Sequence, residues 1–409
     1  MDAQVAVVGA GPAGALIAYL LASRGVDTIL IERQSDFARE FRGEVLMPSG
    51  IRALRACGID LDSVATARPE RFEAFLRGKR FAEVVLEPGG LLEPDAIPMA
   101  VSQPELLEHL VGLGEATGRL EFHRGTSVRG ITISPDHAEL RIRSGGANRE
   151  EALRVPFVIG ADGRGSILRQ RLAPEVRTRS TPLDVVWFKL PLPAAWKDSP
   201  RARFEMGRGE LLLSVTSPNQ ELQVAWVILK GTYGELRKRS PDEWAAAMAH
   251  AADPELAAHL RAQGASLRSP FLLNAVTDRV VGWSGPRHLL VGDAAHTMSP
   301  VGAQGINLAL RDAIVTANQL VPAFREGRDQ GAAAARVEAI RGPEIDRVQR
   351  IAAMPPRVVM GRTIFHAALR RTIALAAGLT RFETLAARAA RNPILSILQN
   401  GLTDVRLEV

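Results

Sequence analysis

The sequence has 409 residues, of which 46% are hydrophobic and 23% charged. These values exclude a disordered chain and predict more than one domain. The net charge of +6 comes mainly from arginines that alternate with acids, so nucleic-acid binding is not expected. The single cysteine and the eight histidines lack metal-ligand spacing, so we expect no disulfide and no metal site.

The N-terminal apolar stretch has two possible interpretations. Residues 5–22 carry no charge and reach the length of a candidate transmembrane helix. However, Gly9, Gly11, Pro12 and Gly14 would break such a helix, and no basic region precedes the stretch. We therefore expect a soluble, cytoplasmic chain.

The same stretch fits a strand, a turn, a helix and a second strand. Residues 5–8 are apolar like a buried parallel strand, and a helix follows as far as Arg24, with Gly25 ending it. The second strand, 28–31, places Glu32 at its carboxyl end. This arrangement predicts a dinucleotide-binding unit, in which Glu32 accepts hydrogen bonds from a ribose.

Glycines in the turn have separate expected roles. In the G-x-G-x-x-G pattern Gly9 allows the tight turn, Gly11 lets the backbone approach a pyrophosphate, and Gly14 lets the helix pack closely. The start of the helix offers free N–H groups and a partial positive charge to the phosphates. The pattern alone does not distinguish NAD from FAD.

The next segments alternate between helix and strand patterns. Residues 70–99 read as strands, and Ser102 with Glu105 suggests a capping box at the start of a helix. Further strands are expected at 120–123, 128–133 and 138–143, antiparallel strands within 183–230, and helices from 304 onward. Cys57 lies in an apolar helical pattern and is expected to be buried and unreactive.

A second motif follows the buried strand in "FVIGADGRGSILRQRL". Asp162 and Gly163 begin the pattern D-G-x-x-S-x-x-R. Ser166 can cap the following helix, and Asp162 can hold the turn while the loop faces a cofactor. An ordinary strand-to-helix turn is the alternative.

A third motif lies in "LLVGDAAHTMSPVGAQGINLALRDA". Gly292 and Asp293 end a strand, and a glycine-containing loop then opens a long helix. The N–H groups and helix dipole of such a loop suit a reduced flavin ring, and Asp293 suits a hydroxyl of the ribityl chain. The cofactor expected from this motif is a flavin.

Together, the three motifs resemble the class A flavoprotein aromatic hydroxylases, the family of p-hydroxybenzoate hydroxylase. The resemblance implies an α/β fold: a discontinuous Rossmann-like FAD-binding domain, an inserted β-sheet-rich substrate domain and a helical C-terminal tail. The expected boundaries are 1–69, 100–175 and 283–345 for the FAD-binding domain, 70–99 and 176–282 for the substrate domain, and 346–409 for the tail.

The resemblance also implies the cofactors and the reaction. NAD(P)H would reduce bound FAD without a Rossmann domain of its own, and O2 would then form a flavin C4a-hydroperoxide that hydroxylates an aromatic or polycyclic small molecule. No catalytic side chain is assigned. The implied cofactor-binding residues are Gly9, Gly11, Pro12, Ala13, Gly14, Glu32, Arg33, Arg42, Gly43, Gln103, Asp162, Gly292, Asp293, Pro300, Gly302, Gly305, Ile306 and Asn307.

Two residues of the third motif need comment. Ala303 stands where the family often has glycine, which questions the backbone approach at that point. His296 follows Gly292 and Asp293, and we expect it to pack beside the cofactor rather than to catalyse.

Other activities share these motifs. A flavin-dependent halogenase, a geranylgeranyl-reductase-like enzyme and a flavin-binding protein without turnover remain alternatives. The halogenase signature W-x-W-x-I-P is matched only weakly by "AWVILKG".

The insertions and the tail offer candidate contact surfaces. An aromatic substrate wall is expected from among Trp187, Phe188, Phe204, Trp226 and Phe271, each of which could instead be core. The tail carries arginines at 357, 362, 370, 371, 381, 388 and 391, and Phe365, Leu369 and Ile373 share one helical face. A helix covering the substrate domain, or a dimer contact in a monomer or homodimer, is the main interpretation, with membrane-surface contact as the alternative.

Overall fold

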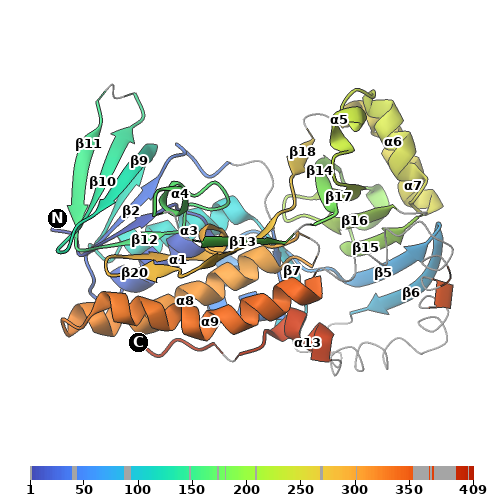
Figure 1. The fold of residues 1–409 in the computed structure, drawn as a ribbon. Helices are drawn as coiled ribbons and strands as arrows, with labels where there is room; N and C mark the ends of the chain where they lie inside the picture. The colour runs from blue at the N-terminus through green and yellow to red at the C-terminus, as the bar shows by residue number, and fades with distance from the viewer. Residues whose placement is uncertain are drawn as a thin grey trace.

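The computed structural model describes residues 2–38, 44–86, 94–146, 149–172, 175–179, 181–207, 210–267, 270–300, 302–352, 368, 371–372, 393–403 and 405–409. These residues form two lobes that lie side by side in Figure 1. We call the lobe around the six-stranded sheet the first lobe and the lobe around the seven-stranded sheet the second lobe.

The first lobe is built on a mostly parallel sheet. Its order is β20 (Ser284–Gly285), β21 (His288–Leu290), β12 (Phe157–Gly160), β1 (Val5–Val8), β2 (Thr28–Glu32) and β8 (Leu120–Arg124). All neighbours pair in parallel except β20 with β21. Every residue of β1, β2 and β12 is buried, as expected of strands covered on both faces.

Helices and smaller sheets surround this sheet. Helix α1 (Pro12–Ala22) packs against α3 (Gln103–Glu115) and α8 (Gln304–Arg325), and α8 packs against α9 (Gln330–Ala352) along the lower edge of Figure 1. The remaining elements of this part are β9 (Thr126–Ile133), β10 (Ala138–Ser144), β11 (Glu151–Val155), α4 (Ile167–Leu172), α2 (Pro48–Ala56), β3 (Val45–Leu46), β7 (Met99–Val101) and β4 (Thr66–Ala67).

The second lobe is a sheet covered by helices on one face. Its order is β18 (Phe271–Leu273), β14 (Leu183–Pro191), β17 (Glu221–Leu229), β16 (Leu211–Thr216), β15 (Arg201–Met206), β5 (Arg71–Leu76) and β6 (Lys79–Val85). Helices α6 (Pro241–Ala249) and α7 (Pro254–Ala262), with the short α5 (Tyr233–Leu236), share a core with one face of this sheet. The pair β13 (Glu175–Arg179) and β19 (Thr277–Val281) joins the chain segments that link the lobes.

Each lobe has its own apolar core. The largest cluster contains α1, α8 and the six-stranded sheet, and a separate cluster lies between the seven-stranded sheet and α6–α7. Cys57 is buried in the first cluster, as predicted, and this burial raises the pKa of its thiol to about 12, which disfavours the nucleophilic thiolate. The predicted α/β class is confirmed as well.

Two local predictions were wrong. The first helix ends at Ala22 instead of Arg24, although Gly25 has the expected positive φ of 86°. Ser102 is the N-cap of α3 but makes no side-chain cap hydrogen bond. The Glu105 carboxylate, which would supply the other half of a capping box, instead accepts a hydrogen bond from the Ala65 N–H at 2.9 Å.

The C-terminal tail is described only in part. Helix α9 extends to Ala352, and α13 (Pro393–Asn400) follows later. Arg371 is exposed, whereas the other six tail arginines and the expected apolar face of Phe365, Leu369 and Ile373 lie outside the described residues. Across the described ranges, no helix is long and apolar enough to cross a bilayer.

Candidate functional site

The three sequence motifs meet at one edge of the six-stranded sheet. They follow β1, β12 and β21, which are adjacent and parallel, so their carboxyl ends lie together. The Ala161 N–H donates to the Val8 carbonyl at 2.8 Å, and the Val291 N–H donates to the Gly160 carbonyl at 2.9 Å. Segments far apart in the sequence therefore form a single site.

Glycines make this convergence possible. Gly9 has φ +97°, and a Cβ there would lie 2.5 Å from the Ala161 carbonyl oxygen. A Cβ at Gly14 would lie 1.8 Å from the Gly9 oxygen, so helix α1 could not pack on the turn. In contrast, a Cβ at Gly11 would meet no protein atom within 4 Å. Protein packing thus requires Gly9 and Gly14, while the space beside Gly11 is open to a ligand.

Two helices begin at the site without side-chain caps. The N-cap residues are Gly11 for α1 and Ala303 for α8, and neither supplies a side-chain acceptor to the first turn. Uncapped N–H groups and the positive end of the helix dipole form an anion site. At Ala303 the backbone is left-handed, with φ 52°, a conformation that costs a non-glycine residue about 1–2 kcal/mol. The replacement of the family's glycine therefore keeps the glycine-like backbone shape.

Glu32 lies beside the first turn. Its carboxylate accepts hydrogen bonds from the Ala10 N–H at 2.9 Å and the Gln34 N–H at 3.0 Å. The residue is only 4% exposed, while the neighbouring Arg33 is exposed. Glu32 thus connects the end of β2 to the glycine turn, where its oxygens lie at the edge expected for a ribose.

Asp162 holds the second turn. Its carboxylate accepts hydrogen bonds from the Ser166 hydroxyl and from the Ile167 N–H, at 2.5 and 2.7 Å. Ser166 in turn accepts from the Arg169 N–H at 3.0 Å, so both predicted turn-holding roles are confirmed. Burial raises the pKa of the Asp162 carboxyl, and these hydrogen bonds oppose the shift.

Asp293 of the third motif is tied to the second. Its Oδ2 lies 3.2 Å from Arg164 Nε, and the Arg164 guanidinium also donates to the carbonyls of Asn274 and Met298. The Asp293 side chain remains about one third exposed. It is therefore accessible for a ligand hydroxyl.

Behind this turn lies a buried charge network. His296 Nε2 lies 2.6 Å from Asp312 Oδ2, and Asp312 Oδ1 accepts from Arg341 Nε at 2.7 Å. Asp312 also accepts from the Gly292 N–H at 3.2 Å. His296 is 1% exposed and packs against Trp283, so the structure gives it a packing role next to the third motif.

Asn307 joins the third motif to β3. Its Oδ1 accepts from the Met47 N–H at 2.8 Å, and its Nδ2 donates to the carbonyls of Val45 and Ala303. The side chain is fully buried in these contacts. Asn307 therefore positions the loop that opens α8 rather than presenting its amide to solvent.

The remaining predicted site residues are placed as follows. Gly302 has φ +106°, Ile306 lies in the first turn of α8, and Gly305 has open space where a Cβ would be. Gln103 is the first residue of α3 and is half-buried. Arg42 and Gly43 lie outside the described residues.

The face of the seven-stranded sheet opposite α6 and α7 carries three of the predicted aromatics. Register pairs Phe204 with Leu213, Leu213 with Ala225, Ala225 with Trp187 and Trp187 with Phe271, so these side chains share one face. Phe204 is 47% exposed, and Trp187 and Phe271 are half-buried.

The other two predicted aromatics have a packing role. Phe188 and Trp226 lie in the helix-covered core, and both contact Trp244 edge-to-face. Because they are on the opposite face of the sheet, they cannot line the same surface as Trp187.

Two polar residues that lie where the first and second lobes meet were not predicted from the sequence. Glu44 directly precedes β3, and Gln223 lies within the apolar strand β17, where it donates a hydrogen bond to Glu44. The available sequence signals were the proximity of Glu44 to Arg42 and Gly43, and a glutamine inside "LQVAWVIL".

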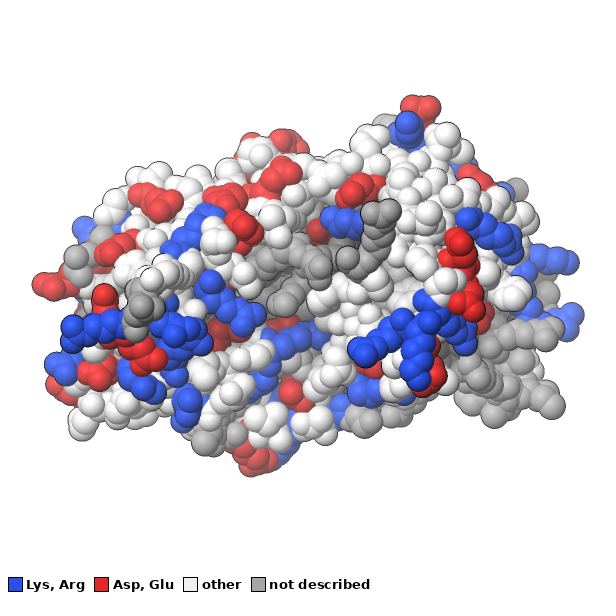
Figure 2. Space-filling view, turned by 90° about the horizontal axis from the view of Figure 1, so that it is seen from above, with Lys and Arg blue, Asp and Glu red and all other residues white. Residues whose placement is uncertain are grey.

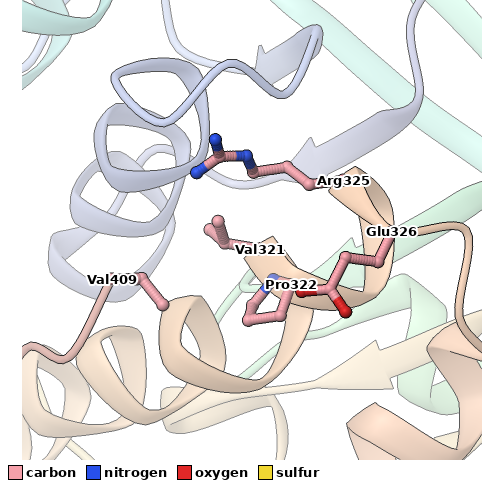
Figure 3. Close-up of a pocket in the computed structure, with 5 residues that line it drawn as sticks. All are labelled: Val321, Pro322, Arg325, Glu326 and Val409. Carbon is pink, nitrogen blue, oxygen red and sulfur yellow. The ribbon is translucent and has the colours of Figure 1, made fainter.

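The described part of the surface has a charge pattern and a hollow that lie apart from this site. On the face shown in Figure 2, basic and acidic side chains of the described residues are interspersed over both lobes. A surface hollow of about 410 Å³ is lined by Val321, Pro322, Arg325, Glu326 and Val409 (Figure 3). It lies at the C-terminal end of α8, about 30 Å from the glycine loop at the other end of this 22-residue helix.

The donor set of the site fits FAD. Two uncapped helix N-termini suit the pyrophosphate and the flavin, the open side of Gly11 leaves room for a phosphate, and carboxylates lie at the two strand ends. These features involve the residues of all three motifs.

Comparisons with known proteins agree with this geometry. The family model described as FAD binding domain matches residues 2–341. The 6-methylpretetramide 4-monooxygenase of Streptomyces rimosus is 30% identical over 380 residues, which cover 91% of this chain and 88% of that protein. The p-hydroxybenzoate hydroxylase of Acinetobacter baylyi is 24% identical over 341 residues, covering 81% of this chain and 80% of that protein.

A solved structure shows the same fold. The p-nitrophenol 4-monooxygenase of Pseudomonas putida superposes with a TM-score of 0.78 at 17% identity, covering 98% of this chain and 99% of that chain. The chain therefore belongs to the FAD binding domain family and, with these relatives, to the class A flavin-dependent aromatic monooxygenases.

Proposed function

We propose that this protein uses NAD(P)H and O2 to hydroxylate an aromatic or polycyclic small molecule on bound FAD. The observation that carries the proposal is the convergence of three glycine-containing turns beside two uncapped helix N-termini. The sequence relatives named above are monooxygenases, which supports an oxygenation over other flavin reactions.

Each turn has a role in holding the cofactor. The N–H groups at the start of α1 donate hydrogen bonds to the pyrophosphate, which lies against the open side of Gly11. Glu32 accepts hydrogen bonds from the adenosine ribose, and Asp293 accepts one from a hydroxyl of the ribityl chain. Residues 302–307, at the start of α8, present backbone N–H groups to the flavin ring, and Asn307 fixes them against β3.

When bound, FAD supplies hydride acceptance from NAD(P)H and transfer of one oxygen atom from O2 to the substrate. The protein orients the aromatic ring and excludes water. The half-buried Trp187 and Phe271, on the sheet face opposite α6 and α7, offer aromatic side chains against which such a ring can pack. Glu44 and Lys189 lie at the end of this face, where it meets the first lobe.

The test begins with the purified protein. We expect a yellow protein that releases FAD on denaturation and consumes NAD(P)H faster when a suitable aromatic compound is added. With ¹⁸O2, the product should gain one labelled oxygen atom per molecule, as measured by mass spectrometry. NAD(P)H consumption that yields only hydrogen peroxide with every aromatic tested would contradict hydroxylation.

A further inference from the structure

A buried polar pair joins the two lobes beside the proposed substrate surface. Glu44, of the first lobe, is 6% exposed, and Gln223, of the second lobe, is fully buried. Gln223 Nε2 donates to Glu44 Oε2, and Lys189 Nζ lies 4.0 Å from Glu44 Oε1. Gln223 and Lys189 are directly opposite each other on β17 and β14.

The pair leaves one strong acceptor unused. Among the described residues, Gln223 Oε1 has no hydrogen-bond partner although it is buried. Buried amide oxygens are nearly always paired, so an unpaired one needs an explanation. A ligand hydroxyl would supply the missing donor.

The position of the pair connects it to both halves of the proposed active site. Gln223 is two residues from Ala225, so its side chain lies on the same sheet face as Ala225 and Trp187. Glu44 precedes Val45, whose carbonyl is bonded to Asn307 at the start of α8. The pair therefore lies between the loop assigned to the flavin and the aromatic face.

The electrostatics favour a neutral partner. Burial raises the pKa of the Glu44 carboxyl, while Lys189 and the hydrogen bond from Gln223 oppose the shift. Glu221, which is 3.5 Å from Lys189, also raises the pKa of Glu44. Among the described residues around Gln223, the cation Lys189 is already paired with Glu44 and Glu221, so it is not free to bind a carboxylate ligand.

We propose that Gln223, oriented by Glu44, is a specificity-determining residue that accepts a hydrogen bond from a neutral phenolic hydroxyl of the aromatic substrate. This inference rests on the proposed function, because the substrate surface is assigned from the position of the flavin loop.

The test compares two probes that differ only at the hydroxyl. FAD-loaded protein is titrated with 2-naphthol and with 2-methylnaphthalene, and binding is followed by the change in flavin absorbance. A site built around a hydroxyl rejects the analogue that lacks it. We expect the wild type to bind 2-naphthol at least tenfold more tightly, and Gln223→Met to lose most of this preference.

A second set of variants tests the role of Glu44. Glu44→Leu removes the acceptor that holds the Gln223 amide, so the preference should fall, while Glu44→Gln, which still accepts a hydrogen bond, should restore it. Ser214→Ala is the matched control, since it removes another buried, unpaired polar group from the helix-covered face of the same sheet. Its preference should equal that of the wild type.

Two results would overturn the inference. One is a Gln223→Met protein that retains FAD and the full preference for 2-naphthol. The other is a wild type with bound FAD that gives no spectral change with either probe. In both cases, aromatic-stimulated NAD(P)H consumption with ¹⁸O incorporation would still support the proposed function, so the two failures are distinguishable.

Discussion

At the scale of single residues, Gly11 separates the requirements of folding from those of binding. Its φ of −74° suits any residue, and an added Cβ meets no protein atom within 4 Å. We therefore expect Gly11→Ala to change the stability of the apoprotein by less than about 1 kcal/mol, because alanine is a poorer N-cap than glycine but restricts the unfolded chain more, and to weaken FAD binding at least tenfold. Thermal unfolding followed by circular dichroism and titration with FAD measure the two effects.

Gly14→Ala is the matched control for that experiment. Its Cβ would lie 1.8 Å from the Gly9 oxygen, so the variant should unfold at a clearly lower temperature even without FAD. Equal FAD affinity in Gly11→Ala and the wild type would show that no phosphate lies against Gly11.

Glu205 makes the stability of the second lobe depend on pH. Burial, with the nearby Asp253 carboxylate, raises the pKa of Glu205 to about 8. The pKa of a glutamate in the unfolded chain is about 4.3, so the Glu205 carboxyl binds its proton more tightly in the folded state. Its stabilising contribution is complete below the unfolded pKa and is lost as the pH rises through about 8, with a slope of up to ~1.4 kcal/mol per pH unit.

Glu205→Gln should remove this pH dependence. The amide stays neutral and can still accept the hydrogen bond that Asp253 N–H donates to Glu205 at 3.2 Å. The variant should therefore be more stable than the wild type at pH 9, with a smaller difference at pH 6, in urea unfolding. Glu235→Gln, at a side chain that is 77% exposed, should follow the wild type at both pH values. Parallel stability curves for Glu205→Gln and the wild type would contradict the assignment.

At the scale of elements, the contact between α8 and α9 depends on buried charges. Asp312 of α8 bonds Arg341 of α9 and His296 of the third motif, and both Asp312 and Arg341 are fully buried. Asp312→Asn removes a negative charge that compensates the buried Arg341 guanidinium, so we expect a loss of about 3–5 kcal/mol in the free energy of unfolding. Urea denaturation of the FAD-loaded protein measures it.

An exposed ion pair at the end of the same helix provides the control. Glu326 and Arg328 are 3.0 Å apart, with more than half of each side chain exposed. Glu326→Gln should therefore change the free energy of unfolding by less than about 1 kcal/mol. An equally small effect for Asp312→Asn would show that the buried network does not hold the two helices together.

The elements also show what the sequence could predict. The first turn was predictable because the hydrogen bond from the Ala10 N–H to Glu32 joins residues of one strand–helix–strand segment. Asp162 and Ser166 were likewise predictable, since both partners lie within the same turn. Asn307 was predicted to bind the cofactor beside the flavin ring, but its hydrogen bond with the Met47 N–H is a long-range contact that spacing cannot reveal.

The same reasoning explains the aromatic residues. The sequence predicted antiparallel strands within 183–230, but the apolar runs of β14 and β17 do not indicate which face meets the helices. The pairing of Trp187 with Phe271, and the burial of Phe188 against Trp244, depend on the helices α6 and α7 that follow much later in the chain. Gln223 and Glu44 belong to different lobes, so only the folded chain brings them together.

At the scale of the whole molecule, the cofactor should stabilise the two lobes unequally. The three turns belong to the first lobe, whose core is separate from the cluster between the seven-stranded sheet and α6–α7. A ligand that binds only the native state, at a concentration one hundred times its dissociation constant, adds about 2.7 kcal/mol to the free energy of unfolding, and local opening of the bound elements is then suppressed.

We expect FAD to slow amide exchange in α1 and the start of α8, measured by hydrogen–deuterium exchange and mass spectrometry. Helix α6 serves as the internal control and should exchange at the same rate with and without FAD. Uniform protection across both lobes would mean that the molecule unfolds as one cooperative unit, with the contacts between the lobes, including Glu44 with Gln223, as strong as those within them.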